Sequence, residues 1–193
     1  SARVLVKFEG RNVGGSIKSR TAYNMILAAE EQGIIDKDSI IVEPTSGNQG
    51  IGLALVGAVK GYKTIIIMPD SVSRERKALV EHYGAEVILI HDEGNIGKAI
   101  AECMETAVRM AAENPKVFVP QQFENEANPN VHRYHTGLEI LEQVAGPIDG
   151  FCSGIGTGGT ITGIGETLKQ QNPNITIWAV EPENAALLAG GTV

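Results

Sequence analysis

The feature that most constrains the fold is a set of short runs in which consecutive residues, rather than alternate ones, are apolar. The run Thr64–Met68 contains three successive isoleucines. A strand that is apolar on consecutive positions is buried on both faces, which is typical of a parallel sheet covered by helices on both sides. The runs predicted as strands are Val4–Phe8, Ser39–Glu43, Thr64–Met68, Glu86–Ile90, Val117–Val119, Gly150–Cys152 and Ile175–Val180.

Longer stretches with helical periodicity separate these runs. Gly33, Gly61 and Gly84 each follow such a stretch, at the place where a left-handed C-cap is easiest for glycine. Helices are predicted near residues 19–32, 48–60, 73–83, 95–113, 130–145 and 159–171. The alternation predicts an open α/β fold, in which ligands bind at the carboxyl ends of the strands.

The composition narrows the class of partner. Hydrophobic residues make up 42% and charged residues 20% of the 193 residues, which is ordinary for a globular protein with a buried core. A net charge of −7 argues against a nucleic-acid groove or an anionic membrane surface. No apolar run approaches the roughly 18 residues that a membrane span needs. We therefore expect a cytoplasmic protein that works on small molecules.

The cysteines and histidines show no metal-binding pattern. Cys103 and Cys152 lie in apolar surroundings without C-x-x-C spacing, and we predict that both are buried, reduced thiols. His132 and His135 are three residues apart on a predicted helix, but no third ligand is evident. We predict no metal site.

The stretch 9–20, EGRNVGGSIKSR, places a lysine at the start of a predicted helix. Gly14 and Gly15 predict a tight turn just before Lys18. The helix macrodipole is positive at this end, so it disfavours an ammonium group and lowers the pKa of Lys18. A neutral lysine amine is what Schiff-base chemistry requires. Taken alone, the stretch favours the alternative, a solvated lysine at the start of a helix.

The stretch 43–50, EPTSGNQG, follows a predicted strand and opens a predicted helix. The side chains of Thr45, Ser46 and Asn48, together with backbone N–H groups around Gly47, form an array that binds a carboxylate or a phosphate. The alternative is that these residues only cap the helix.

The stretch 153–162, SGIGTGGTIT, contains four glycines and four hydroxyl side chains. Successive backbone N–H groups of such a loop can surround one phosphate. The loop lacks the Gly-Lys-Ser/Thr ending of a nucleotide P-loop but contains the dinucleotide spacing G-x-G-x-x-G, with Glu181 after the next predicted strand. A dinucleotide site would have no use for the loops around Lys18 and Gly47. We therefore favour a phosphate-bearing cofactor that has a second anchor, which Lys18 could supply covalently.

The chain resembles the O-acetylserine sulfhydrylase (cysteine synthase) and cystathionine β-synthase family, which are fold-type II pyridoxal-phosphate enzymes. Four stretches carry the resemblance in the family's order, and it extends over essentially the whole chain. They are KFEGRNVGGSIKSR, EPTSGNQGIGLA, QQFENEANPNVH and SGIGTGGTITG.

The resemblance implies a role for each matching residue. Lys18 would bind pyridoxal 5′-phosphate covalently and then move the substrate's α-proton. Asn48 would bond the 3′-oxygen of the cofactor. The residues implied for the 5′-phosphate are Gly156, Thr157, Gly158, Gly159 and Thr160. Those implied for the α-carboxylate of the amino-acid substrate are Thr45, Ser46, Gly47, Gln49 and Gln122.

The implied reaction is β-replacement on an O-activated serine, with sulfide as the nucleophile and L-cysteine as the product, in a homodimer. Two other outcomes on the same cofactor stay open: cystathionine synthesis and cysteine consumption by a lyase. A third alternative is a non-catalytic regulatory paralogue, which would have no need of Lys18.

The sequence departs from the family pattern at four places. Gln49 stands where the family usually has Thr, and Ser19 where it has Asp. Asn125-Glu126 replaces Asn-Pro, and the stretch 135–138 replaces Thr-Thr-Gly-Pro. Gln49 is the departure that bears most on substrate choice, unless its side chain points into solvent.

We assign residues 15–125 to a smaller N-terminal α/β lobe. Residues 1–14 and 126–193 are assigned to a larger C-terminal lobe, with the polar stretch 121–130 at the seam. The resemblance implies a catalytic core that is longer at both ends, with the serine that meets the pyridine nitrogen beyond residue 193. We do not expect these 193 residues to be active alone.

Overall fold

The computed structural model describes residues 2–186, 188 and 190. The chain divides into two compact units, Ser1–Asn125 and Glu126–Val193. This division falls within the polar stretch 121–130. The assignment of residues 1–14 to a larger lobe stays a prediction.

The first unit is built on a parallel sheet with the strand order β3-β2-β1-β4. Its strands are β1 (Ile40–Pro44), β2 (Lys63–Pro69), β3 (Glu86–Ile90) and β4 (Val117–Phe118). The three isoleucines of β2 are all buried. The predicted parallel sheet with buried central strands is confirmed.

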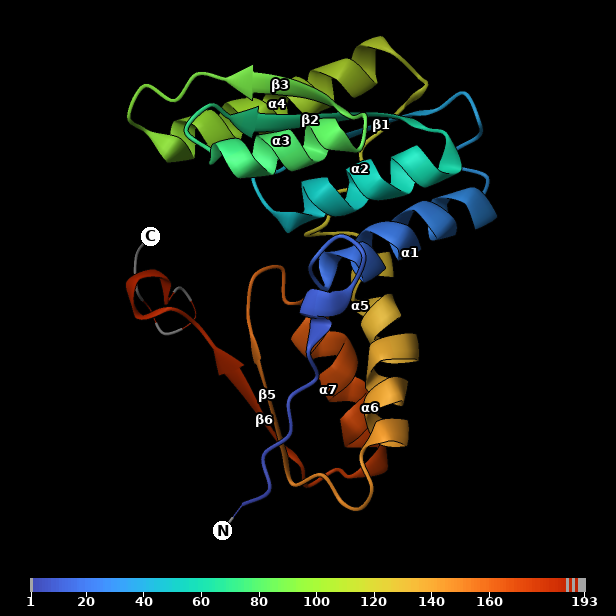
Figure 1. Cartoon of the computed structure of the whole chain (residues 1–193), viewed down its shortest axis with the longest axis vertical. Coiled ribbons are helices and arrows are strands. Elements are labelled where there is room, and N and C mark those ends of the chain that lie inside the picture. The colour runs from blue at the N-terminus through green and yellow to red at the C-terminus, as the bar shows by residue number, and fades with distance from the viewer. Residues whose placement is uncertain (1, 187, 189, 191–193) are drawn as a thin grey trace. The chain divides into compact units, whose positions relative to one another are not determined.

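Helices cover both faces of this sheet, as Figure 1 shows. They are α1 (Lys18–Glu31), α2 (Asn48–Lys60), α3 (Arg74–His82) and α4 (Ile96–Glu113). Ile66 of β2 packs in one core cluster with α1 and α2, whereas Ile65 and Ile67 pack against Cys103 of α4. Because successive strand residues point to opposite faces, the isoleucine run serves both layers.

The contact between α1 and α2 depends on a glycine. A Cβ added to Gly52 would lie 2.8 Å from the backbone oxygen of Lys18 and 2.9 Å from the Cβ of Ala22. The close approach therefore fixes the start of α1 against α2. The left-handed conformation predicted at three helix ends is also confirmed: Gly61 is the C-cap of α2, and Gly33 and Gly84 directly follow the C-caps of α1 and α3, with φ angles of +82°, +68° and +83°.

The second unit contains a two-stranded parallel sheet, β5 (Gly150–Gly154) with β6 (Thr176–Val180). Its helices are α5 (Ala127–Val131), a π-helical turn (His132–Thr136), α6 (Gly137–Gln143) and α7 (Gly159–Gln171). Ile140 of α6 and Leu168 of α7 belong to its core, against which β5 and β6 pack. Short 3-10 turns occupy Glu9–Arg11 and Glu183–Ala185.

Two predictions about local structure are wrong in part. The single helix near 130–145 is three helical pieces, because a π-helical turn interrupts it. Cys152 is exposed, since it lies on a face of β5 that no described helix buries, whereas Cys103 is buried as predicted. Burial raises the pKa of the Cys103 thiol to about 11.

The predicted strand Val4–Phe8 is also wrong. None of its residues belongs to a strand, and the side chains of Val4 and Phe8 are 82% and 70% exposed. Apolar side chains favour an extended backbone, but a strand forms only where a neighbouring strand accepts and donates its hydrogen bonds. Within the described residues, no strand offers that partner.

Candidate functional site

Lys18 is the first residue of α1, directly after a tight glycine turn. Gly15 has a φ of +74° and donates its N–H to the backbone oxygen of Asn12 at 2.7 Å. The N–H of Gly14 donates to the hydroxyl of Ser19 at 3.0 Å. Ser19, one of the departures from the family pattern, therefore ties the turn to the helix that carries Lys18.

Burial lowers the pKa of the Lys18 ammonium group, and the nearby carboxylate of Glu43 opposes this shift. The direction agrees with the sequence prediction, but the main physical cause is desolvation rather than the helix macrodipole. A larger fraction of Lys18 is thus a neutral amine at a given pH than for a solvated lysine. Such an amine can act as a nucleophile or a base.

The loop after β1 leads directly into α2. The hydroxyl of Thr45 accepts the N–H of Gly47 at 3.3 Å, and Gly47 is an N-cap without a side-chain capping bond. Ser46 accepts a bond from Arg76 at its backbone oxygen, and Asn48 is exposed at the first position of the helix. The start of α2 therefore has the positive end of a helix dipole and no side-chain cap, which suits an anion.

Gln122 lies beside this loop, although it is 77 residues away from Thr45 in sequence. Its amide nitrogen donates to the Thr45 hydroxyl at 3.4 Å. Two residues that sequence analysis assigned to the same substrate carboxylate are therefore neighbours in the first unit.

Gln49 does not point into solvent. Its side chain is 1% exposed, and its amide nitrogen lies 3.4 Å from the sulfur of Met25 in α1. Its amide oxygen is buried and has no hydrogen-bond partner. Buried amide oxygens normally accept a bond, so this one is available to a donor that enters the site.

Glu43 is a functional candidate that the sequence did not single out. It is 1% exposed in β1, and burial raises the pKa of its carboxyl to about 7. Hydrogen bonds from the backbone of Gln121 and Gln122, and the charge of Lys18, act against this shift. An acidic residue within a run of buried strand positions was the available signal, because buried carboxylates need a specific partner.

The raised pKa of Glu43 makes a prediction about stability. The folded pKa of about 7 exceeds the ordinary 4.5, so folding favours the protonated form. The stability that protonated Glu43 contributes is fully present below pH 4.5. It is lost as the pH rises through 7, and the loss in unfolding free energy is at most about 3 kcal/mol. Between pH 5 and 8, the unfolding free energy should fall less in Glu43→Gln than in the unmodified protein.

Urea unfolding at several pH values measures the slope of the unfolding free energy against pH. The control is Glu86→Gln, which alters a half-exposed carboxylate at the start of β3. It should keep the slope of the unmodified protein. An equal slope in Glu43→Gln would show that Glu43 does not titrate in this range.

In the second unit, the glycine loop forms the N-terminus of α7. Gly158 is its N-cap, with a φ of +82° and no side-chain capping bond. A Cβ added at Gly156 or Gly158 would meet no atom within 4 Å, so these glycines border open space. The hydroxyl of Thr157 accepts bonds from the Asn128 amide at 2.8 Å and from the Gly159 N–H at 3.4 Å.

A buried histidine, His132, lies against Thr160 and supports the glycine loop. Nε2 of His132 lies 3.4 Å from the hydroxyl of Thr160, and its Nδ1 lies 3.0 Å from the hydroxyl of Thr136. The π-helical turn contains both His132 and Thr136, and such turns are frequent at functional sites. The sequence suggested His132 only as a metal ligand and gave Asn128 no predicted role.

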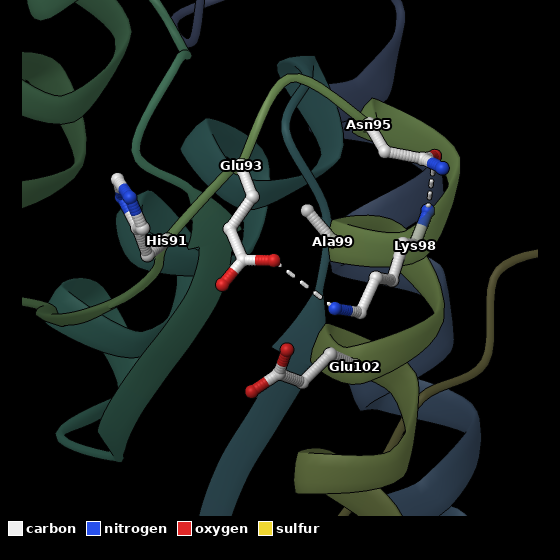
Figure 2. A pocket seen from close by; sticks show the side chains of 6 residues that line it. All are labelled: His91, Glu93, Asn95, Lys98, Ala99 and Glu102. Carbon is white, nitrogen blue, oxygen red and sulfur yellow. Dashed lines mark hydrogen bonds and ion pairs between the residues drawn. The ribbon is translucent and has the colours of Figure 1, made fainter.

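A separate pocket lies on the connection between β3 and α4, with a volume of about 130 Å³. Its lining residues are His91, Glu93, Asn95, Lys98, Ala99 and Glu102. Figure 2 shows Lys98 paired with Glu93, at 3.2 Å, and bonded through its backbone to the side chain of Asn95. None of the residues predicted for a cofactor or a substrate lines it. We assign no function to this pocket.

Comparisons with known proteins agree with the fold and with the motifs. A family model described as "Pyridoxal-phosphate dependent enzyme" matches residues 1–192. A cysteine synthase from a Flavobacterium species is 48% identical over 189 residues, which cover 98% of this chain and 60% of the relative.

Two solved structures are also similar. A hydrogen sulfide-producing enzyme from Fusobacterium nucleatum has a TM-score of 0.88 and 45% identity, over 97% of this chain and 60% of that one. An O-acetylserine dependent cystathionine beta-synthase from Helicobacter pylori has a TM-score of 0.87 and 35% identity, over the same shares. The chain thus spans about 60% of the length of the relatives it matches. Among the described residues, no helix has the length and apolarity needed to cross a bilayer.

Proposed function

Because the chain belongs to the pyridoxal-phosphate dependent enzyme family, we propose that the natural-length protein makes L-cysteine by β-replacement. Its substrates are an O-activated serine and sulfide. The predicted fold class, that of the fold-type II members of this family, is confirmed by the similarity to solved structures. The observation that carries the reaction is the 48% identity to a cysteine synthase, together with a lysine held at the start of α1.

The residues present fit the family cofactor. In the second unit, the start of α7 has no side-chain bond from its N-cap residue Gly158 and borders open space at Gly156 and Gly158, which suits a phosphate. Thr157, Gly159 and Thr160 add hydroxyl and N–H donors. In the first unit, Lys18 supplies the amine for the covalent bond, and Asn48 an amide for the 3′-oxygen. When bound, pyridoxal phosphate supplies an electron sink for negative charge at the substrate's α-carbon.

The chain's own residues then bind the substrate and move a proton. The substrate α-carboxylate accepts bonds from the start of α2 and from the Thr45–Gln122 pair, with Ser46 and Gly47 in the same loop. Lys18 would hold the cofactor, and as a neutral amine it would take the substrate's α-proton and later return it to the same carbon. Burial favours the neutral amine and the charge of Glu43 favours the ammonium, so the two shifts oppose each other.

A substrate panel tests the reaction with the natural-length protein. O-Acetylserine with sulfide should give cysteine faster than serine with homocysteine gives cystathionine, or cysteine alone gives sulfide. A higher rate in either of the other two reactions would replace cysteine synthesis by the corresponding alternative. Absence of all three reactions, with cofactor bound, would favour the regulatory paralogue.

Cystathionine synthesis and cysteine consumption are the second candidates because of Gln49. Its buried amide replaces the threonine usual in the family, beside the proposed carboxylate site. The similar structures include a cystathionine beta-synthase and a hydrogen sulfide-producing enzyme. A larger side chain at this position can change which amino acid fits.

We expect Gln49→Ala to weaken substrate binding more than cofactor binding. The NH₂ group of Gln49 has a second hydrogen beside the one directed at the Met25 sulfur, and its bond to the charged carboxylate would contribute about 1.5–3 kcal/mol, so substrate affinity should fall by roughly tenfold to a hundredfold. Gln49→Thr should favour O-acetylserine over cysteine. Titration of both variants with both amino acids, followed in the cofactor's absorption spectrum, measures this effect.

The matched control for Gln49 is Met25→Leu. It removes the sulfur that lies against the Gln49 amide but leaves the loop after β1 unchanged. Its titration curves should match those of the unmodified protein. If Gln49→Ala also matches them, Gln49 has no part in substrate binding.

We also propose that the natural-length protein is a cytoplasmic homodimer. The support is the resemblance to the cysteine synthase family. Light scattering of the purified protein should give twice the chain mass, and cell fractionation should place the activity in the cytoplasm. A monomer mass would reject the dimer.

A further inference from the structure

The carboxylate of Glu43 joins two segments that are far apart in sequence. One of its oxygens accepts the backbone N–H of Gln121 at 3.0 Å, and the other accepts that of Gln122 at 3.3 Å. These donors lie 78 and 79 residues from Glu43 in sequence. The end of β1 is thus tied through a side chain to the segment that follows β4.

The tied segment has an unfavourable backbone conformation. Gln121 has a φ of +58°, and it is the one non-glycine residue with a positive φ among those described. This conformation is unfavourable for a non-glycine residue, so it persists only where the surroundings hold it. The oxygen of Gln121 also accepts the N–H groups of Glu124 and Asn125, both at 3.0 Å. The hydrogen bond to Glu43 holds Gln121 through its N–H group, whereas these two bonds hold it through its oxygen.

The consequence of this arrangement is the position of the Gln122 side chain. With the backbone of Gln122 bonded to Glu43, its amide nitrogen reaches the hydroxyl of Thr45 at 3.4 Å. Thr45 lies two residues after Glu43, directly beyond the end of the same strand. One strand end therefore supports both halves of the Thr45–Gln122 pair.

A carboxylate suits this position better than its neutral isostere does. Both oxygens of a carboxylate accept hydrogen bonds, whereas the amide of glutamine has one acceptor and would turn an NH₂ group toward the second N–H. The desolvation that raises the pKa of Glu43 disfavours its charge. The buried acid is therefore retained at a cost to stability, as expected of a residue with a role in the site.

We propose that Glu43 is a positioning residue for the substrate's α-carboxylate: it holds the 121–122 backbone so that the Gln122 amide and the Thr45 hydroxyl bind the carboxylate together. This inference rests on the proposed use of Thr45 and Gln122 in substrate binding. It does not depend on which β-substituted amino acid is the natural substrate, because all of them carry the same α-carboxylate.

Glu43→Gln in the natural-length holoenzyme tests the role. The KM for O-acetylserine should rise by roughly tenfold to a hundredfold, the range for a lost bond to a charged group. The KM for the analogue with an α-carboxamide should change little, so the preference for the carboxylate is lost. The matched control, Glu86→Gln, should leave both values unchanged.

A double-mutant cycle separates this role from an effect of Glu43 on Lys18. If Glu43 acts through Gln122, the variant Gln122→Ala should raise the KM by a similar factor, and adding Glu43→Gln should raise it little further. A full additional rise in the double variant, or a fall in kcat without a rise in KM, would overturn the proposal.

Amide hydrogen exchange gives a readout that needs no reaction and no variant. In the unmodified protein, the N–H groups of Gln121 and Gln122 should exchange as slowly as that of Thr45, which bonds to the oxygen of Ile67 at 2.9 Å. Rapid exchange at both would overturn the proposal even if Glu43→Gln does not fold. If exchange at Gln121 and Gln122 is slow but the protein makes no cysteine, the proposed function is rejected. The hydrogen bonds from these two residues to Glu43 would still be supported.

Discussion

Lys18→Ala is expected to abolish measurable turnover in the natural-length enzyme. Lys18 is the one residue proposed both to hold the cofactor and to move the α-proton. Acid–base catalysis alone contributes roughly 10²- to 10⁴-fold, and the loss of the covalent anchor adds to it. Cysteine formation from O-acetylserine and sulfide, measured at saturating cofactor, gives the size of the effect.

The variant should still bind some cofactor without a covalent bond, because the proposed phosphate loop lies in the second unit. Lys77→Ala is the matched control: it alters a half-exposed lysine on α3, four residues from its ion-pair partner Glu81. It should be fully active. Near-normal turnover in Lys18→Ala would contradict the assigned role and, with it, the proposed reaction.

Gly158→Val is expected to weaken cofactor binding by roughly tenfold or more. Gly158 has a φ of +82°, which a β-branched residue adopts only with strain. Its added Cβ would also point into the open space proposed for the phosphate. The loss of one charge-assisted hydrogen bond at the start of α7 costs about 1.5–3 kcal/mol, which corresponds to that change in affinity.

Equilibrium titration of the cofactor-free protein with pyridoxal phosphate measures this affinity. Gly165→Ala is the control on the same helix, because its added Cβ would lie 3.7 Å from Ile177, an ordinary contact distance. Gly158→Ala has the same backbone strain with less bulk. Its dissociation constant should lie between those of Gly165→Ala and Gly158→Val. An unchanged dissociation constant for Gly158→Val would show that this loop does not hold the phosphate.

The local structure that the sequence predicted well depends on interactions within a few residues. The left-handed caps at Gly33, Gly61 and Gly84 follow from glycine's freedom at positive φ. The helix boundaries at Asn48 and Gly159 follow from glycine-containing turns just before them. The isoleucine run of β2 implied burial on both faces, because helices must cover a parallel sheet.

The predictions that failed concern interactions between segments. Val4–Phe8 has the composition of a strand, but its backbone has no ladder partner among the described residues. Cys152 lies in an apolar run, but whether a strand face is buried depends on which helix packs on it. The π-helical turn at His132 has no sequence signal that distinguishes it from the α-helix on either side.

By itself, the sequence determined the α/β class, the glycine loops and the identity of the candidate amine, hydroxyl and amide groups. The tertiary structure alone decided which of these groups meet and which are desolvated. It placed Gln122 beside Thr45 across 77 residues, turned Gln49 into the interior and buried Glu43 against two backbone donors. The physical reason is that pKa shifts and carboxylate binding depend on distance and burial in space, which residue spacing along the chain does not contain.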